Sequence, residues 1–448
     1  MTKHRRTTLA IAVIAALSLA GCETLTDFFA LGGQEPILEG ERVPIMAAEA
    51  VFTADPAMNE VEVELPAPIL IEQWPLPGAN AANKIPHLQA AGLLQPIWQV
   101  NAGKGTDWRS ILTASPIVAD GKIFVLDAAG HIYTYDAASG AAIWNQSLAL
   151  EQEDSPERNY GGGIAFADGR LYVTTGHRRA LAINANSGEE IWSIATETPV
   201  HASPSVADGR VYVITTENQL LVLNSEDGEL LWEHRGIAEP SALAASSNAA
   251  VSGDTVIVPY TSGELYALRT DNGLPYWGDQ LSRTTNVTAL TVLNDIAGRP
   301  VVDDDMVFAV SHSGTLVGIN MRTGGRAWTR NVPGIQSPLV VGEFVYVVST
   351  VGQVLCINRG DGRIKWVTQL PAFENPNDRE DVIVWTGPLI VNNRLLLFSS
   401  DGRGVSLLPS TGQVASQIGI PGGTFVAPIM ANGILYVLTS EAELVALR

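Results

Sequence analysis

The fold is decided by a stretch in the middle of the chain, residues 203–232, which reads SPSVADGRVYVITTENQLLVLNSEDGELLW. Its first two apolar runs flank the pair Asp208-Gly209. An Asp-Gly pair in this position is typical of a tight hairpin turn, because the central residues of that turn need positive φ angles. Further short apolar runs follow, and the stretch ends at Trp232. It therefore predicts a meander of four short antiparallel strands.

The same pattern recurs along most of the chain. Six copies end in a tryptophan, at Trp144, Trp192, Trp232, Trp277, Trp328 and Trp366. A seventh copy (387–415) has Ala415 in that place, and an eighth (427–447) stops before reaching it. Residues 95–100, QPIWQV, form the opposite fragment, because they hold Trp98 but lack the three preceding strands. Pairing the two fragments would complete one more copy and close a ring.

The distance between successive tryptophans identifies the kind of repeat. It lies between 38 and 51 residues, as in four-stranded propeller blades and unlike most helical repeats. We therefore predict an all-β protein with an eight-bladed β-propeller over residues 93–448, whose last blade is closed by the strand 95–100. Seven blades is the alternative, if one weak copy is an insertion. The copies resemble the PQQ-type propeller repeat, which implies that the recurring tryptophans are structural and says little about chemistry.

Composition excludes several classes of protein. The 448 residues include 46% hydrophobic and 17% charged residues, which argues against long disorder. The 47 acidic residues outnumber the 27 basic ones, so the formal net charge is −20. A strongly acidic surface repels phosphate backbones, and nucleic-acid binding is therefore not expected.

The first residues indicate the cellular compartment. Basic residues precede an apolar run, 9–20, that is too short to span a membrane, so residues 1–21 are predicted to be a signal peptide. The run is followed by Leu19-Ala20-Gly21-Cys22, which resembles the lipobox of bacterial lipoproteins and implies lipidation of Cys22. The alternative is an ordinary cleavage site with an incidental cysteine. The second cysteine, Cys356, lies in an apolar strand and is expected to be a buried small hydrophobe.

Residues 22–92 show no long period and contain many prolines. We predict an extended tether that begins at the lipidated cysteine. The alternating stretch 61–65, VEVEL, is a candidate for an extra strand along the folded body.

Two functions compete for such a propeller. In a quinoprotein dehydrogenase, a quinone cofactor lies on the propeller axis with a vicinal disulfide, a calcium ion and a carboxylate base. This chain has no adjacent cysteines, and its seven histidines lack metal-ligand spacing. Neither a phosphate-binding loop nor a G-x-S-x-G motif occurs. We therefore predict a protein that is not an enzyme and has no cofactor and no metal site.

The second function is that of a scaffold. A lipobox, a tether and an eight-bladed PQQ-type propeller without cysteine pairs together resemble the BamB family, the periplasmic lipoproteins of the outer-membrane β-barrel assembly (BAM) machinery. The resemblance implies an outer-membrane lipoprotein that faces the periplasm. It also implies binding to the POTRA domains of the central barrel subunit, as a monomer within a hetero-complex, and assistance to outer-membrane protein insertion. A lipoprotein that binds cell-wall components is a third alternative.

The irregular segments indicate which face binds. In a meander, the loops between second and third strands and the crossovers between blades open on one face, and the long segments 151–161, 235–250, 278–299 and 372–386 all belong to it. Two of them resemble the family's partner-binding loops. The resemblance implies contact roles for Leu243 and Asp295, although Ala297 replaces the second acid of the family pattern. Either Arg283 or Arg299 could supply the missing cation of this site, and Arg299 is taken as the candidate contact residue.

Overall fold

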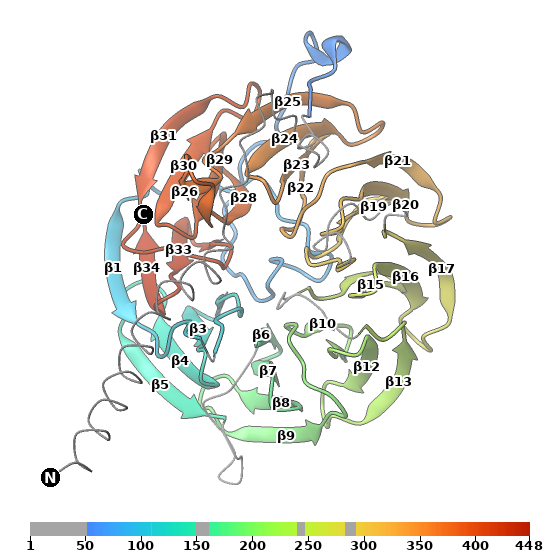
Figure 1. Cartoon of the computed structure of the whole chain (residues 1–448). Coiled ribbons are helices and arrows are strands. Elements are labelled where there is room, and N and C mark those ends of the chain that lie inside the picture. Colours follow the sequence, from blue (N-terminus) through green and yellow to red (C-terminus); the bar gives the residue numbers. More distant parts are fainter. Residues whose placement is uncertain (1–51, 109, 149–160, 240–246, 283–292) are drawn as a thin grey trace, which may run out of the picture. The chain divides into compact units, whose positions relative to one another are not determined.

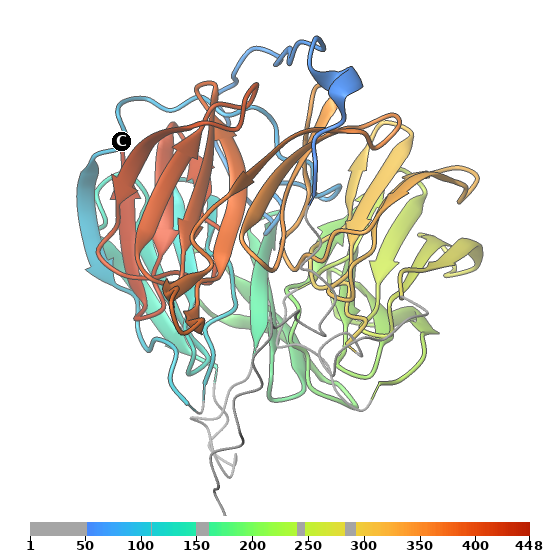
Figure 2. The ribbon, with the colours of Figure 1, turned by 45° about the horizontal axis from the view of Figure 1, so that its top comes forward.

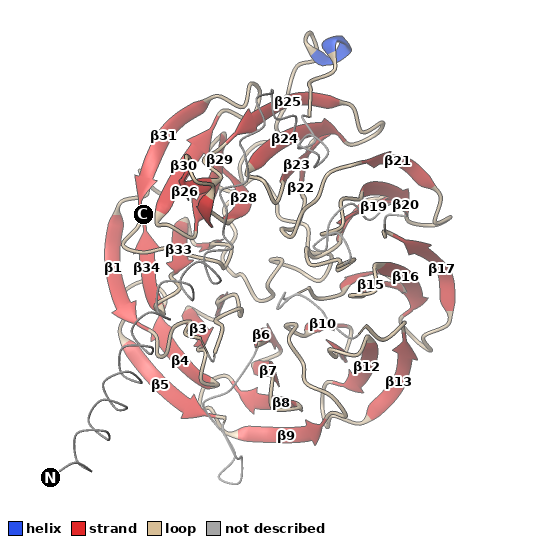
Figure 3. Ribbon diagram, viewed as in Figure 1, coloured by secondary structure: helices blue, strands red, loops and turns tan. Residues whose placement is uncertain are grey.

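The computed structural model describes residues 52–108, 110–148, 161–239, 247–282 and 293–448. Residues Phe52–Arg448 form one compact unit. Figure 1 shows this unit as a ring of small sheets arranged around a common axis, and Figure 3 shows that nearly all its regular structure is β. In these described ranges the only helix is the 3-10 turn η1, Pro56–Met58, and none could cross a membrane.

The described ranges contain eight four-stranded antiparallel sheets, which confirms the predicted eight-bladed propeller. Each blade is a meander in which successive strands pair. The first four blades are β2–β5 (Ile117–Ala119, Lys122–Leu126, His131–Asp136, Ala142–Ser147), β6–β9 (Gly162–Ala167, Arg170–Thr175, Arg179–Asn184, Glu190–Ala195), β10–β13 (Ser205–Ala207, Arg210–Ile214, Gln219–Asn224, Leu230–Arg235) and β14–β17 (Ala250–Ser252, Thr255–Pro259, Glu264–Arg269, Pro275–Gln280).

The remaining blades continue around the ring. Blades 5 to 8 are β18–β21 (Val301–Asp303, Met306–Val310, Leu316–Asn320, Arg326–Arg330), β22–β25 (Leu339–Val341, Phe344–Val348, Gln353–Asn358, Ile364–Gln369), β28–β31 (Trp385–Val391, Arg394–Ser399, Arg403–Leu407, Val414–Gly419) and β32–β34 (Ile429–Ala431, Ile434–Leu438, Glu443–Leu447) with β1 (Pro96–Asn101). A small hairpin, β26–β27 (Phe373–Asn375, Glu380–Val382), lies in the crossover from blade 6 to blade 7.

The turns between the first two strands of each blade explain the Asp-Gly pairs. In blade 1, Asp120 and Gly121 have φ angles of 49° and 71°. In blade 3, Asp208 and Gly209 have nearly the same values, 48° and 71°. Asp and Gly tolerate this left-handed conformation better than most residues do, so the sequence fixes a two-residue hairpin at each place.

The core lies between neighbouring blades. The inner three strands of each blade are almost wholly buried, and the outer strand is largely exposed; in blade 3, for example, all of Gln219–Asn224 but its last residue is buried, whereas no residue of Leu230–Arg235 is. This burial on both faces accounts for the continuous apolar runs in the sequence, because each inner strand packs against the blades on either side.

The recurring tryptophans join each blade to the next. The indole N–H of Trp144, in blade 1, donates to the backbone carbonyl of Ala185 in blade 2, at 3.3 Å. Its ring also covers Gly188, where a Cβ atom would come within 3.2 Å of the indole. The same bond to the next blade is made by Trp98, Trp192, Trp232, Trp277, Trp328 and Trp366. The predicted structural role of these residues is confirmed.

Blade 7 has Ala415 in place of the tryptophan, and the ring topology explains why. In every other blade the indole reaches the turn between the third and fourth strands of its neighbour. Blade 8 has no such turn, because its fourth strand, β1, comes from the other end of the sequence. A tryptophan at position 415 would therefore lack its acceptor.

The ring is closed as predicted. Strand β1 pairs antiparallel with β34, with Trp98 opposite Ala446 and Val100 opposite Leu444. The same strand is linked to blade 1, since the Trp98 indole donates to the carbonyl of Ala138 at 3.0 Å. The two ends of the repeat region therefore hold each other in place (Figure 1).

Residues 52–92 do not form the predicted tether; they lie across one end of the ring, and we name them the plug segment. Trp74 and Leu88 are completely buried, and Trp74 exchanges two backbone hydrogen bonds with Val118 of blade 1. Other backbone atoms of the segment bond to blades 2, 4, 5, 6, 7 and 8, one or two bonds each. Figure 2 shows the segment at the upper end of the propeller.

The tether prediction is therefore wrong for residues 52–92, and residues 22–51 lie outside the described ranges. The proposed extra strand at Val61–Leu65 is not formed, although the side chains of Val63 and Leu65 pack against blades 6 and 7. The segment resembles a tether in the sequence because its apolar residues are isolated. Each of them fills a separate site on the ring, so the sequence shows no regular period.

Candidate functional site

The two faces of the ring differ in what covers them. The face that carries the first and third turns of each blade is covered by the plug segment, which contacts it from blade to blade. The opposite face carries the loops between second and third strands and the crossovers between blades. We name it the crossover face. It is the face that the sequence predicted for binding.

Four large apolar side chains are exposed on the described part of the crossover face, each from a different crossover. Trp108 is 81% exposed and Phe425 is 47% exposed, and Ile237 and Val382 are also exposed. Trp108, Val382 and Phe425 belong to three consecutive crossovers, those from blade 8 to blade 1, blade 6 to blade 7, and blade 7 to blade 8. Exposed apolar side chains on several crossovers of one face are candidates for contact with a partner.

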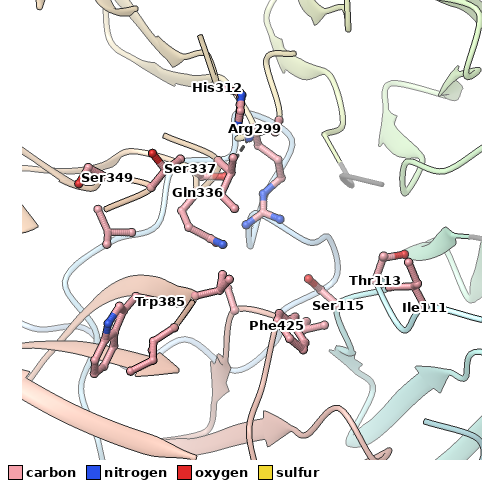
Figure 4. A pocket seen from close by; sticks show the side chains of 18 of the residues that line it. Ile111, Thr113, Ser115, Arg299, His312, Gln336, Ser337, Ser349, Trp385 and Phe425 are labelled. Atoms are coloured by element: carbon pink, nitrogen blue, oxygen red, sulfur yellow. Dashed lines mark hydrogen bonds between the residues drawn. The ribbon is translucent and has the colours of Figure 1, made fainter. Parts of the chain in front are cut away.

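An inner cavity of about 450 Å³ opens among the same crossovers. Its walls come from the crossovers that enter blades 1, 5, 6, 7 and 8 and from the loops between the second and third strands of blades 5 and 6, together with Val348 and Trp385 at the ends of β23 and β28. Figure 4 shows polar side chains such as Ser115, Gln336 and Arg299 around the open space, together with the rings of Phe425 and Trp385. Phe425 therefore belongs both to the exposed apolar set and to the cavity wall.

Arg299 is the charged group of this cavity. Its backbone N–H donates to the Ser337 hydroxyl at 3.0 Å, but its Nε atom is buried and has no hydrogen-bond partner. Partial burial of the side chain lowers the pKa of Arg299 to about 10. That value is still well above neutral pH, so the side chain remains a cation. No carboxylate in the described ranges forms an ion pair with it.

The other titratable residue of the cavity is neutral. His312 lines the same wall, and burial lowers its pKa below the ordinary value of 6.5. The histidine is therefore uncharged at pH 7, and Arg299 supplies the net charge of the described cavity wall. The cavity thus combines one cation, several neutral hydrogen-bonding groups and apolar walls.

The three residues predicted to contact a partner have different positions. Leu243 lies outside the described ranges, as does the alternative cation Arg283. Asp295 is only 2% exposed, which differs from the exposed loop position that the sequence suggested. Its backbone carbonyl accepts from the N–H of His312 at 2.8 Å, so this part of the crossover is folded into blade 5. Substitution of Asp295 by arginine would bury a second cation and does not serve as a surface variant.

The structure does bring the two predicted loops together. The Ser247 hydroxyl, just after the segment with Leu243, donates to the carbonyl of Gly298 at 3.4 Å, next to Arg299. A small hollow nearby is lined by Ser247, Asp295 and His201. The crossovers into blades 4 and 5 are therefore neighbours, although Arg299 points into the inner cavity and not to the rim (Figure 4).

Sequence reasoning missed Trp108 and Phe425. Both lie outside the repeated pattern, in crossovers whose other residues are mostly small or polar. An aromatic residue in such a segment is a signal for partner contact, because aromatic side chains dominate interface energetics. The number of tryptophans outside the repeat, Trp74, Trp108 and Trp385, could have drawn attention to these positions.

The cavity does not fit the quinone and calcium of a quinoprotein dehydrogenase. Its described wall contains no aspartate, glutamate or cysteine. Within the described ranges, no group of three or more acidic, histidine or cysteine side chains is placed to hold a metal ion. Cys356 is buried in strand β24, as predicted, and burial raises the pKa of its thiol. A carboxylate base, a calcium site and a vicinal disulfide thus have no counterparts among these residues.

A family model and several known proteins are similar to this chain in sequence. A family model described as outer membrane protein assembly factor BamB matches residues 95–157 and 128–368, which together span more than half of the chain. The outer membrane protein assembly factor BamB of Xanthomonas campestris is 34% identical over 254 residues, 55% of this chain and 62% of that protein. The corresponding protein of Shewanella oneidensis is 25% identical over 254 residues, 55% of this chain and 64% of that protein.

An uncharacterised protein of Rickettsia conorii is 29% identical over 235 residues, 51% of this chain and 55% of that protein. The chain thus matches between 55% and 64% of the length of these three relatives. Solved structures of the same fold cover a larger share of this chain than these sequence relatives do.

Two solved structures illustrate the fold. BamB from Moraxella catarrhalis superposes with a TM-score of 0.67 at 19% identity and covers 80% of this chain and 100% of that chain. Quinohemoprotein alcohol dehydrogenase from Comamonas testosteroni gives a TM-score of 0.64 at 14% identity, covering 84% and 80%. At such identities the likeness establishes the propeller fold alone.

Proposed function

Because the chain belongs to the family of the outer membrane protein assembly factor BamB, we propose that it is a scaffold lipoprotein of the BAM machinery that faces the periplasm. Its partner is the central barrel subunit, bound through that subunit's POTRA domains. The protein assists insertion of outer-membrane proteins by holding its partner, without catalysing a reaction.

The observation that carries this proposal is the exposed apolar set on the crossover face. Trp108, Val382 and Phe425 come from consecutive crossovers of one rigid ring, and they stand exposed. Burial of aromatic and aliphatic side chains at the centre of a patch supplies most of the affinity of a protein interface. The opposite face is already occupied by the plug segment. A partner therefore binds the crossover face.

A non-enzymatic role agrees with the chemistry of the inner cavity. In the described ranges, no hydroxyl on its wall hydrogen-bonds to a histidine or carboxylate that could act as a general base. Leu243 remains a proposed contact on the same face. The contribution of Asp295 is to shape the crossover into blade 5 and not to meet the partner from an exposed position.

Replacing both Val382 and Phe425 by serine should weaken copurification of the central barrel subunit from envelope extracts. Loss of two apolar contacts near the centre of an interface is expected to lower affinity by about tenfold or more, or ~1.4 kcal/mol and above. Leu70→Ser is the matched control, because Leu70 is 53% exposed but lies on the plug segment.

The control variant should retain full copurification, and both variants should melt like the unaltered protein because the substituted side chains are exposed. Undiminished copurification by the Val382 and Phe425 variant, together with a loss in the Leu70 variant, would place the interface on the other face.

Lipid anchoring through Cys22 is the second part of the proposal. Two or more acyl chains give stable membrane attachment, so Cys22→Ala should leave the protein uncleaved or soluble in the periplasm. Fractionation of cells followed by mass measurement of the mature N-terminus checks this. A correctly cleaved variant that still fractionates with the outer membrane would contradict lipidation at this residue.

A further inference from the structure

The cavity around Arg299 holds a half-buried charge that no carboxylate of the described residues pairs. The Nε atom has no hydrogen-bond partner, and the described wall supplies no carboxylate. An ionised group enclosed by protein is costly unless it is paired and hydrogen-bonded. A protein that folded only to form a rigid ring would gain stability from an apolar side chain at this position, so the cation indicates a ligand.

The direction of the side chain supports this reading. Figure 4 shows the guanidinium of Arg299 pointing into the open space of the cavity, with Gln336 and Ser115 facing the same space. On its other side, Arg299 borders a small hollow lined by Trp74 and Ile85 of the plug segment. The walls of the inner cavity itself come from the crossovers and the loops of the crossover face, so a ligand would enter from that face.

The size of the cavity limits what it can hold. Its volume of about 450 Å³ lies within the range of ordinary small-molecule pockets, roughly 300–1,000 Å³, and is many times that of one water molecule. A single ion such as chloride would leave most of it unfilled. The space fits an organic ligand of moderate size.

The chemistry of the walls specifies the ligand further. A guanidinium presents a planar fork that matches a carboxylate bidentately. The hydroxyl of Ser115 and the amide of Gln336 can bind its remaining oxygen lone pairs. The apolar atoms of Leu112, Val384 and Phe425 suit a hydrocarbon body. A phosphate would place a second negative charge beside a single cation and would gain nothing from these apolar walls.

We propose that the inner cavity is a binding site for a small monocarboxylate with an apolar body, whose carboxylate pairs with Arg299. Neither the family of this chain nor its proposed scaffold role requires such a site, and the inference does not depend on that role. A bound carboxylate would neutralise Arg299 and bridge the crossovers into blades 5 and 7, which both line the cavity.

The test is titration calorimetry of the full-length protein with benzoate, compared with benzamide, a neutral compound of nearly the same shape. Benzoate should bind with one site per chain at micromolar to millimolar concentration, and benzamide should bind at least tenfold more weakly. Sodium sulfate at matched ionic strength should produce no saturable heat. These three titrations need no variant.

Arg299→Gln should weaken benzoate binding at least tenfold, whereas Arg322→Gln should not, because Arg322 is exposed in a turn of the same blade on the opposite face. The Arg299 variant should also melt at or near the temperature of the unaltered protein, since it removes a half-buried charge whose Nε atom has no hydrogen-bond partner. Equal binding of benzoate and benzamide, absence of benzoate binding, or undiminished binding by the Arg299 variant would each overturn the proposal.

Discussion

Removal of residues 23–104 is expected to convert the folded protein into aggregates without a cooperative melting transition. This deletion takes away strand β1, which is the only partner of β34 on its outer side. Leu444, Val445, Ala446 and Leu447 are buried in the closed ring, and an unpaired apolar strand edge is a template for pairing with other chains. The link from Trp98 to blade 1 is lost as well.

Two shorter deletions separate ring closure from the other contacts. Removal of residues 23–51 leaves the whole compact unit and should change its melting little. Removal of 23–92 keeps β1 but discards the plug segment, so the product should be monomeric and less stable. Size-exclusion chromatography with thermal unfolding measures both properties. The closure account fails if the protein without 23–104 stays monomeric and melts like the one without 23–92.

Trp74→Ala should lower the free energy of unfolding by about 3–5 kcal/mol, the loss expected when a large aromatic side chain is deleted from a well-packed interior. Trp74 is completely buried beneath the ring, and its indole N–H donates to the carbonyl of Pro77 at 3.3 Å. If the segment were a tether, the same substitution would have almost no effect. Urea unfolding followed by circular dichroism gives the free energy directly.

Leu70→Ala is the matched control for this measurement, because it removes an exposed apolar side chain from the same segment. It should change stability by no more than about 0.5 kcal/mol, as is usual for surface substitutions. Similar small effects for Trp74 and Leu70 would mean that residues 52–92 are not docked in solution.

Repetition made the fold predictable. The tryptophan, the Asp-Gly turn and the apolar runs recur in copy after copy, so each confirms the others, and the strand 95–100 could be assigned to the last blade from two incomplete fragments. The exception at Ala415 could be seen in the sequence but not explained from it. Its cause is the missing turn in blade 8, which only the closed ring reveals.

The plug segment was not predictable, because no local pattern marks it. Its backbone bonds go to different blades, one or two to each, for instance between Leu88 and Ile390 and between Phe166 and Pro75, and therefore impose no strand period. Prolines and isolated apolar residues are equally typical of an extended linker. A docked segment differs from a free linker because the ring offers sites that fit its apolar side chains. Those sites are assembled from distant parts of the sequence.

The candidate site was predicted in part. The strand order of a meander correctly predicted on which face the crossovers lie. The exposure of each residue within a crossover depends on how that crossover packs against the ring. Asp295 turned out to be buried, and Arg299 lies in the inner cavity, whereas Trp108 and Phe425 stand exposed. A single sequence does not separate these outcomes, because a charged residue in a loop is usually solvated.

The central claim is that the crossover face holds the central barrel-assembly subunit, and site-specific photocrosslinking in intact cells tests it most directly. A photoreactive phenylalanine analogue replaces Phe425 in one protein and Leu70, on the plug segment, in another; both side chains are exposed. The account predicts that irradiation joins the position-425 protein to the central barrel subunit and that the position-70 protein gives no such product. Crosslinking to that subunit from position 70 and not from position 425 would contradict it.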